Sequence, residues 1–565
     1  MDRRTILALV LMAIVLVVTP MLFPSARHAT TARPDTTAVA ASATPTPSAS
    51  ATPVAHAPET AAAPTIAAAP PAATGAPKPA ADSAVVVTPR AKYTLLAPGA
   101  VPVRAQIDSF VDLRPGRRGD TVVVAQDRGP LLHYRIVLGR DTIALDTVAM
   151  SIQTSGSTTT FTSSAPALTI SYGPGPNGYS MQVQGSVANA PAGSALLIDL
   201  PHDFRSVEAD TLDDMRNFAY GYKQPVRDVT SVPFSKLDST QVRADTGSME
   251  WVVARSKYWV VGLINPPTMT KGGAFHDIWM RGGTRVNRIT RTASATTMTP
   301  LTNGQFAFTL YIGPQSWPVL HAMGRDLENV NPYASFLRPI IQPFTTIIIR
   351  VLLWMKANIR VNYGWVIVIF GVVIRFLLWP LYVKSMRTSL AMQRLQPELS
   401  ELQKKYKSDP EKQREALMKV YQAHGMSPLS PMLGCLPMLL PMPILYAMYF
   451  VFRSTIEFRG VPFLWLPDLA LRDPYYIIPI VMGLSMFLLS WIGMRAAPPN
   501  PQTKMMSYMM PAMFTIMFMN LASGLNLYYA VQNIASLPQQ WLIAKERAKV
   551  GPPPAAAKPA VAKKS

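Results

Sequence analysis

The spacing of hydrophobic and polar residues changes along the chain, and each change marks a different kind of structure. From about residue 93 to residue 314 the period is two, as where Leu132, Tyr134 and Ile136 alternate with more polar neighbours. A period of two places successive side chains on opposite faces of a strand, so these segments predict half-buried β-strands. Several such strands predict an all-β sandwich over residues 93–330.

One pair of strands is joined by a turn rich in glycine and proline. Leu168, Ile170 and Tyr172 alternate up to residues 173–178, Gly-Pro-Gly-Pro-Asn-Gly, and the alternation resumes at Tyr179. The turn also has the Gly-x-Gly-x-x-Gly spacing of a dinucleotide-binding loop, but such a loop must open a helix, and here a strand follows. The segment therefore predicts a β-hairpin and no cofactor site.

Apolar runs of near-spanning length dominate the second half of the chain. The runs cover residues 363–383, 431–452, 475–494, 506–521 and 526–544. A further run lies within residues 1–23, after two arginines, and it is longer than the core of a usual signal peptide. A retained anchor is therefore favoured over a cleaved signal. The fold class is thus a multi-domain membrane protein: a periplasmic all-β sandwich plus a polytopic α-helical bundle, with six transmembrane helices in all.

Residues 24–92 separate the anchor from the predicted strands. They consist mostly of alanine, proline, threonine and serine, without leucine or aromatic residues. Such a composition cannot bury enough apolar surface to offset the entropy lost on ordering. The segment predicts a disordered linker.

The basic residues set the predicted orientation. The formal net charge is +21, which could indicate nucleic-acid binding, but lysines and arginines gather in short segments beside the apolar runs. They are concentrated between the runs 363–383 and 431–452, between the runs 475–494 and 506–521, and after the run 526–544. Basic loops stay in the cytoplasm, so both termini are predicted to be cytoplasmic and the β-domain periplasmic.

Three further segments flank the spans. Residues 334–357 have polar positions at helical spacing, which favours an amphipathic helix in the membrane surface; the alternative, a spanning helix, is disfavoured because Arg350 lies in its middle. Residues 384–428 predict a cytoplasmic helical hairpin with an apolar stripe. Residues 549–565 form a basic cytoplasmic tail.

Catalytic and metal sites are not predicted. Cys435 is the only cysteine, which excludes intrachain disulfides and cysteine-rich zinc sites. Its expected role is packing. The adjacent pairs His202-Asp203 and His276-Asp277 are expected to be surface turn residues rather than metal ligands or catalytic groups. No hydrolase motif is present.

Arg375 is the charged residue inside the span 363–383. Placing arginine in hydrocarbon costs at least about 2.5 kcal/mol, so such a residue usually faces a polar cavity. The alternative is that its side chain snorkels toward the cytoplasmic surface from roughly 13 Å inside the membrane, which is at or beyond comfortable reach. The other apolar runs contain no acidic residue that could neutralise it. A cavity is favoured.

Methionine is concentrated in the run 506–521 and just before it. Methionines occupy positions 505, 506, 509, 510, 513, 517 and 519. Unbranched thioether side chains adapt to many apolar partners, although methionine is also ordinary lipid-facing filler. Both interpretations stay open.

Several ordered motifs resemble the YidC/Oxa/Alb family of membrane insertases. They are Val-Val-Ile-Arg-Phe-Leu-Leu-Trp-Pro-Leu around Arg375, Leu395-Gln396-Pro397-Glu398, Ser427-Pro428-Leu429, Gly434-Cys435-Leu436-Pro437, Met442-Pro443-Ile444, Asp473-Pro474-Tyr475-Tyr476, and Ser523-Gly524-Leu525 before Leu527-Tyr528-Tyr529. The resemblance covers residues 340–548 almost continuously. It is weaker in the β-domain, and Gly371 stands where the family has a polar residue, which predicts poorer hydrogen bonding there.

The resemblance implies an insertase core over residues 362–548, with a groove formed by five helices and open to cytoplasm and lipid. Arg375 would be the groove arginine, Met442, Pro443 and Met517 would contact the incoming helix, and Tyr529 would line the groove. It implies no enzyme activity and no cofactor. The implied partners are nascent membrane proteins, the ribosome, the Sec translocon and the lipid bilayer of the bacterial inner membrane.

Two other classes of function compete with this interpretation. An anion-selective channel or transporter could use the same arginine, but transporters usually show repeated halves, and no internal repeat is present. A scaffold could use the bundle only as an anchor, but a simple anchor needs no charge inside the membrane.

Overall fold

The computed structural model describes residues 82–269, 272–286, 289–331, 338–406, 409–423, 442–495 and 501–550. The predicted anchor 1–23, Cys435 and the tail beyond residue 550 lie outside the described residues, as does nearly all of the predicted linker.

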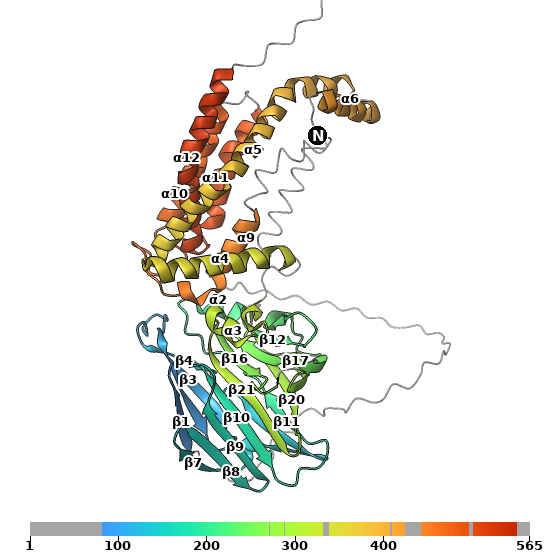
Figure 1. Ribbon diagram of the computed structural model, residues 1–565, viewed down its shortest axis with the longest axis vertical. Coiled ribbons are helices and arrows are strands. Elements are labelled where there is room, and N and C mark those ends of the chain that lie inside the picture. The colour runs from blue at the N-terminus through green and yellow to red at the C-terminus, as the bar shows by residue number, and fades with distance from the viewer. Residues whose placement is uncertain are drawn as a thin grey trace, which may run out of the picture. The chain divides into compact units, whose positions relative to one another are not determined.

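Strands fill the described chain up to residue 314 and form three large sheets (Figure 1). The four-stranded sheet contains, in order, β1 (Ser83–Thr88), β2 (Ala91–Leu96), β3 (Val101–Val111) and β4 (Thr121–Ala125). The nine-stranded sheet contains β13 (Thr230–Pro233), β12 (Ala219–Lys223), β15 (Trp251–Arg255), β16 (Trp259–Ile264), β21 (Gln305–Pro314), β10 (Ser180–Val187), β9 (Ala167–Pro174), β8 (Thr158–Ser164) and β7 (Ser151–Ser155). The six-stranded sheet contains β14 (Arg243–Met249), β17 (Phe275–Gly282), β20 (Ala293–Pro300), β11 (Ala195–Asp199), β5 (His133–Leu138) and β6 (Asp141–Ala144). A small pair consists of β18 (Arg285–Val286) and β19 (Ile289–Thr290).

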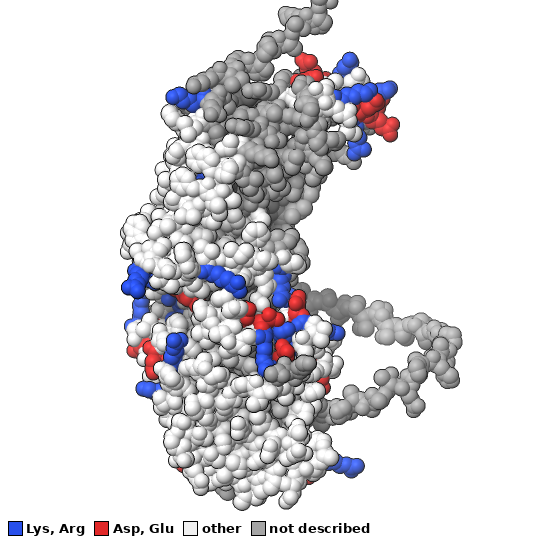
Figure 2. All heavy atoms as spheres, viewed as in Figure 1, with Lys and Arg blue, Asp and Glu red and all other residues white. Residues whose placement is uncertain are grey.

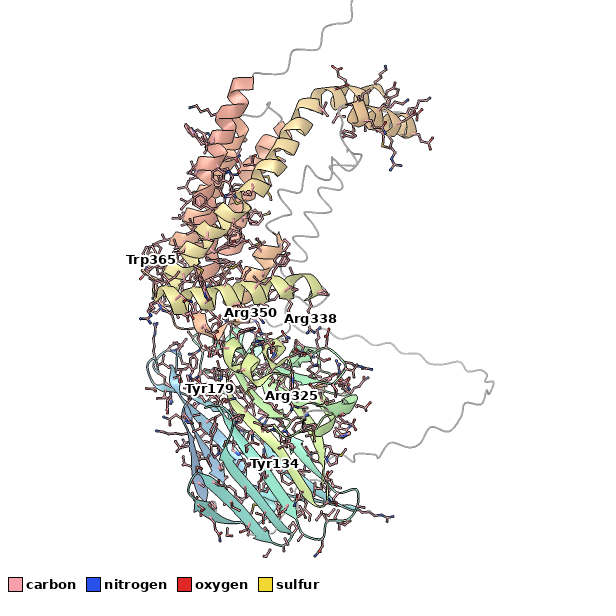
Figure 3. All side chains as sticks on the ribbon, in the orientation of Figure 1. Tyr134, Tyr179, Arg325, Arg338, Arg350 and Trp365 are labelled. Carbon is pink, nitrogen blue, oxygen red and sulfur yellow. The ribbon has the colours of Figure 1, made fainter. Side chains whose placement is uncertain are left out.

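The nine-stranded and six-stranded sheets share one apolar core. Phe275 of β17 and Phe308 of β21 pack edge to face, with their ring centroids 6.0 Å apart. The hydroxyl groups of Tyr134, labelled in Figure 3, and Tyr172 lie 3.0 Å apart across the same interior. Buried side chains from both sheets belong to one contiguous cluster. The strand-rich domain is therefore held by packing between sheet faces.

The predicted hairpin at residues 168–183 is confirmed, whereas the predicted end of the linker is not. In the antiparallel pair β9–β10, Val183 lies opposite Tyr172, as the alternation predicts. The boundary at residue 92 is wrong, because β1 begins at Ser83 and pairs with β2. Val85–Val87 favours a strand, but these three valines follow a long segment rich in alanine and proline, whose composition predicts disorder.

The remaining elements are mostly helices. They are α2 (Thr211–Arg216), α3 (Trp317–Met323), α4 (Arg338–Ile359), α5 (Tyr363–Lys405), α6 (Pro410–Ala423), α9 (Met442–Ser454), α10 (Ile477–Arg495), α11 (Pro501–Phe518) and α12 (Ser523–Val550). A short 3-10 turn, η5 (Ile456–Phe458), follows α9. Figure 1 shows α5, α10, α11 and α12 running alongside one another.

α5 differs from its prediction. It continues without a break from the predicted span through residue 383 to Lys405, so the span and the first arm of the predicted hairpin are one helix. α5 contains both Pro380 and Pro397, and neither ends it, because helix-forming residues surround both prolines and carry the helix on. Leu395 and Leu399 of the predicted stripe are buried.

Within the described residues, two segments are long and apolar enough to cross a membrane, Tyr363–Pro380 and Ile477–Met494. The apolar part of α11, Ser507–Phe518, is shorter. The count of six spans therefore stays a prediction.

Candidate functional site

A cavity of about 320 Å³ lies among the helices, and α5, α9, α10, α11 and α12 all contribute to its wall. Its lining residues are Ile374, Arg375, Leu378, Ile444, Leu445, Met482, Met486, Met510, Phe514, Phe518, Tyr528, Tyr529, Gln532, Asn533 and Ser536. Most of this wall is apolar, and the polar exceptions are Arg375 and residues of α12. The cavity is thus amphiphilic, with its polar groups concentrated on two helices.

The polar groups of α12 also join it to its neighbours. The Gln532 side chain donates a hydrogen bond to the carbonyl oxygen of Gly371 in α5 over 2.8 Å. The Asn533 side chain donates to the carbonyl oxygen of Met482 in α10 over 3.4 Å. These residues, with Ser536, recur at helical spacing in an apolar run, and that signal in the sequence could have identified them. Gln532, Asn533 and Ser536 are not among the residues predicted above.

Gly371 lies at a close approach of two helices. A Cβ atom there would lie 3.1 Å from Cγ1 of Val531, which is tighter than most real contacts. The backbone carbonyl of Gly371 accepts the hydrogen bond from Gln532. Gln532 of α12 thus places a polar group beside Gly371, and the expectation that this part of the groove is poorer in hydrogen bonding stays a prediction.

Arg375 is half-buried in the cavity wall and is held by α12. Its guanidinium donates a hydrogen bond to the side-chain oxygen of Gln539, which is only 2% exposed. Among the described residues that line the cavity, none is acidic. A neutral amide of α12 therefore helps to position the guanidinium.

The other predicted site residues differ in their positions. Tyr529 lines the cavity, and its ring packs edge to face on Phe518 with centroids 5.4 Å apart. Pro443 and Met517 are half-buried and are not among the described lining residues. Met442 begins α9, but its side chain lies outside the described ones.

Neighbours of Met442, Pro443 and Met517 in the sequence line the cavity instead. Ile444 and Leu445 represent α9, and Phe518 represents the end of α11. Among the described lining residues the methionines are Met482 and Met486 of α10 and Met510 of α11, so only one methionine of the cluster at positions 505–519 lines the cavity there.

A buried ion pair connects the β-domain to the segment that follows α9. Nε of Arg459 lies 2.7 Å from Oε2 of Glu208, and the two side chains are 2% and 6% exposed. The indole N–H of Trp259 donates to the other carboxylate oxygen over 3.0 Å, and the guanidinium of Arg459 lies 5.5 Å from the centre of that indole ring. Both charged groups of this enclosed pair therefore have close hydrogen-bonding partners, which a buried charge requires.

A second ionic contact lies at the end of α9. Asp213 of α2 contacts Nζ of Lys257 at 2.9 Å and a guanidinium nitrogen of Arg453 at 3.5 Å. Burial alone raises the pKa of Asp213, but the positive charges of Lys257 and Arg453 outweigh burial and hold that pKa below its ordinary value. The neighbouring Asp214 behaves oppositely: burial and the charge of Glu208 raise its pKa from 3.8 to about 7.

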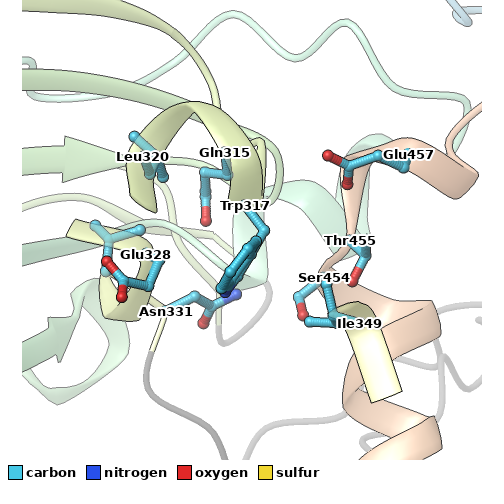
Figure 4. Close-up of a pocket in the computed structure, with 10 residues that line it drawn as sticks. Gln315, Trp317, Leu320, Glu328, Asn331, Ile349, Ser454, Thr455 and Glu457 are labelled. Atoms are coloured by element: carbon cyan, nitrogen blue, oxygen red, sulfur yellow. The ribbon is translucent and has the colours of Figure 1, made fainter. Parts of the chain in front are cut away.

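A small polar cavity of about 20 Å³, room for roughly one water molecule, lies beside this contact (Figure 4). Trp317 and Glu328 line it from the β-domain, Ile349 from α4, and Thr455 and Glu457 from the segment after α9. The guanidinium of Arg350, which Figure 3 labels on α4, lies 4.9 Å from the Trp317 ring centre. α4 therefore also contacts the β-domain.

Two family models match successive parts of the chain. The model described as the YidC periplasmic domain matches residues 145–347, and the model described as the 60Kd inner membrane protein matches residues 354–550. The chain belongs to the YidC family. It is an inner membrane protein with a periplasmic domain, as predicted, and the YidC family is not a family of enzymes.

Curated relatives carry the description membrane protein insertase YidC. The relative from Anaeromyxobacter sp. (strain Fw109-5) is 37% identical over 261 residues, which is 46% of this chain and 46% of the relative. The relative from Syntrophus aciditrophicus (strain SB) is 33% identical over 336 residues, 58% of each chain. This chain therefore spans about half the length of the curated YidC relatives it matches.

Solved YidC structures also align with the chain. An active YidC insertase crystal structure with the first transmembrane domain resolved aligns at 18% identity and a TM-score of 0.32, over 83% of this chain and 93% of that one. YidC from Thermotoga maritima aligns at 14% identity and a TM-score of 0.29, over 81% and 96%.

Proposed function

We propose that this YidC family member is a membrane protein insertase and chaperone that helps integral membrane proteins insert, fold and assemble. The observation that carries the proposal is the amphiphilic cavity: five helices build it, Arg375 projects its charge into it, and most of the remaining wall is apolar. An incoming helix with a short polar tail presents the same two kinds of surface.

The energetics of such a cavity suit insertion without a chemical step. Moving an apolar segment from water into lipid yields roughly 0.8 kcal/mol for each buried CH₂ group. The obstacle is the polar tail, which must cross hydrocarbon where unpaired polar groups are costly. Arg375 and the polar face of α12 offer hydrogen bonds and positive charge at that point, which lowers the barrier for an acidic tail in particular.

The proposed topology has six spans, with both termini in the cytoplasm and the β-domain in the periplasm. The distribution of basic residues supports it. α4 would lie in the membrane surface; in support, Phe344, Ile347 and Trp354 are exposed large apolar residues on it. The proposed partners are nascent membrane proteins, the ribosome on the cytoplasmic side, and the Sec translocon.

The deciding experiment is depletion of the chain in its own cell, followed by measurement of the insertion of small membrane proteins with acidic periplasmic tails. The expected result is accumulation of uninserted substrate, with recovery when the intact chain is restored. Insertion at the normal rate, with no second insertase present, would overturn the proposal.

A further inference from the structure

A tight turn at residues 463–466 presents two apolar side chains to the outside. The backbone N–H and C=O groups of Phe463 and Leu466 bond to each other over 3.0 and 2.9 Å, and both side chains are buried. Between them, Leu464 is 67% exposed and Trp465 is also exposed. Leu464 has a φ of 54°, a left-handed conformation that a bulky side chain seldom adopts. The fold accepts this strain to present a leucine where a polar residue or glycine would be usual.

This turn lies beside the first residues of both segments that are long and apolar enough to cross a membrane. Phe463 packs on Gly364, where a Cβ would lie 2.0 Å from its ring, and its ring lies 5.5 Å from that of the exposed Trp365, labelled in Figure 3. The indole N–H of Trp465 donates over 3.2 Å to Asp473, four residues before Ile477. One segment begins at Tyr363 and the other at Ile477. The turn therefore lies where both segments begin, and in the topology proposed above, on which this inference rests, that is a boundary between hydrocarbon and water.

Arginines surround the turn. Arg118, at the tip of the β3–β4 hairpin, donates to the carbonyl oxygen of Pro467 over 3.4 Å. Arg117 is the exposed neighbour of Arg118 in the sequence, and Arg472 is exposed one residue before Asp473, which accepts the hydrogen bond from Trp465. Figure 2 shows, on one face, a band in which Lys and Arg side chains are mixed with Asp and Glu, bordering a described helical surface with few charges.

The acidic residues in the same region compensate this positive charge only in part. Asp473 is fully buried and accepts three hydrogen bonds, and Asp468 is buried. Asp112 pairs with Arg114. Asp108 on β3 and Asp120 in the loop to β4 are exposed acids, against the exposed Arg117, Arg118 and Arg472.

We propose that this surface binds anionic phospholipids in the leaflet that faces the β-domain. Leu464 and Trp465 enter the interface between headgroups and acyl chains, where tryptophan is preferred. The guanidinium groups of Arg117, Arg118 and Arg472 bind lipid phosphates, for which their planar donor geometry is suited. The strained turn and the hairpin together form an anchor that holds the β-domain end of α5 and α10 at a set depth.

Depth can be measured directly with the full chain in lipid nanodiscs. In a Cys435→Ser background, Leu464→Cys is labelled with bimane and quenched by brominated lipids. The matched control is Val226→Cys, since Val226 is 97% exposed in the β-domain. Strong quenching at residue 464 and almost none at residue 226 is expected. Absence of quenching at residue 464, or equal quenching at both, would overturn the proposal.

Lipid preference is tested separately with the unlabelled chain. Phospholipids retained after purification in mild detergent are quantified for the wild type and for Arg117→Gln/Arg118→Gln. The control, Lys92→Gln/Arg104→Gln, removes two exposed charges from the four-stranded sheet. Arg104 lies seven residues before the end of β3, which separates it from that end of the strand by roughly 23 Å.

A severalfold loss of retained phosphatidylglycerol is expected in the hairpin variant only. Equal retention in all three chains would overturn the proposal. So would loss of a co-purifying protein with unchanged lipid, because the arginines would then be a protein-docking site. None of these readouts depends on insertion activity.

Discussion

Arg459 and Glu208 form an enclosed ion pair that joins the segment after α9 to the β-domain, with Nε of the arginine 2.7 Å from Oε2 of the glutamate. The two residues are 251 positions apart in the chain. Their contact lies next to the second ionic contact, where Arg453 meets Asp213. The helix that supplies Ile444 and Leu445 to the cavity is therefore attached to the β-domain at its far end.

We expect Arg459→Met to lower the stability of the full chain by about 3–5 kcal/mol, because Glu208 would be left as an unpaired buried charge. Thermal unfolding in detergent measures the loss. Lys419→Met is the control, since its pair with Glu415 is exposed, and it should unfold like the wild type. The double variant Arg459→Met/Glu208→Gln should regain part of the stability. A single variant as stable as the control would contradict the importance of the pair.

Arg375→Ala should impair insertion of substrates with acidic tails several times more than insertion of substrates with neutral tails. The reason is that its positive charge lies in a cavity wall without acidic neighbours among the described lining residues. Arg375→Lys keeps the charge and should be milder. Parallel insertion assays with both substrate sets measure the difference, and equal defects for the two sets would show that the charge does not attract the tail.

Gln539→Glu should reproduce part of the Arg375→Ala defect without removing the arginine. It places a carboxylate where a neutral amide now accepts the guanidinium hydrogen bond, so the charge in the cavity is neutralised. Gln540→Glu adds the same carboxylate one residue later, where the Gln540 amide lies near Gly493 of α10. The expected result is a severalfold loss for acidic tails with Gln539→Glu only. Equal insertion defects in the two variants would mean that the carboxylate at position 539 does not act through Arg375.

The stability of the β-domain should fall as the pH rises from about 4 to 7. The folded-state pKa of Asp214 is raised from 3.8 to about 7, chiefly by burial, so the folded domain binds a proton more tightly than the unfolded chain does. This contribution is fully present below pH 3.8 and is lost by about pH 7. Asp214→Asn removes the buried charge and keeps an oxygen for the 2.9 Å hydrogen bond from the backbone N–H of Lys257.

The melting temperature should therefore increase in Asp214→Asn relative to the wild type, more at pH 8 than at pH 5. Asp141→Asn, at an exposed position in β6, serves as the control and should track the wild type at both values. An Asp214→Asn effect independent of pH would indicate that the carboxyl group is already ionised in the folded domain at pH 5.

The elements themselves were largely predictable because they depend on neighbours in sequence. The alternation through Tyr172 and Val183 predicts the strands that form β9 and β10, and the apolar runs predict α10 and α12. The start of β1 was missed, since three valines in a long alanine- and proline-rich segment are a weak local signal. The continuity of α5 was missed because a change from apolar to basic composition was taken for the end of a helix.

The sequence by itself determined the family, the division into a strand-rich and a helical part, and Arg375 as the charge inside a span. Only the tertiary structure identified what surrounds that charge: Gln539, the polar face of α12, and the methionines of α10. It alone paired Arg459 with Glu208. The physical reason is that periodicity and composition report the environment of a residue along its own element, whereas the partner of a buried polar group is chosen by packing between elements far apart in the chain.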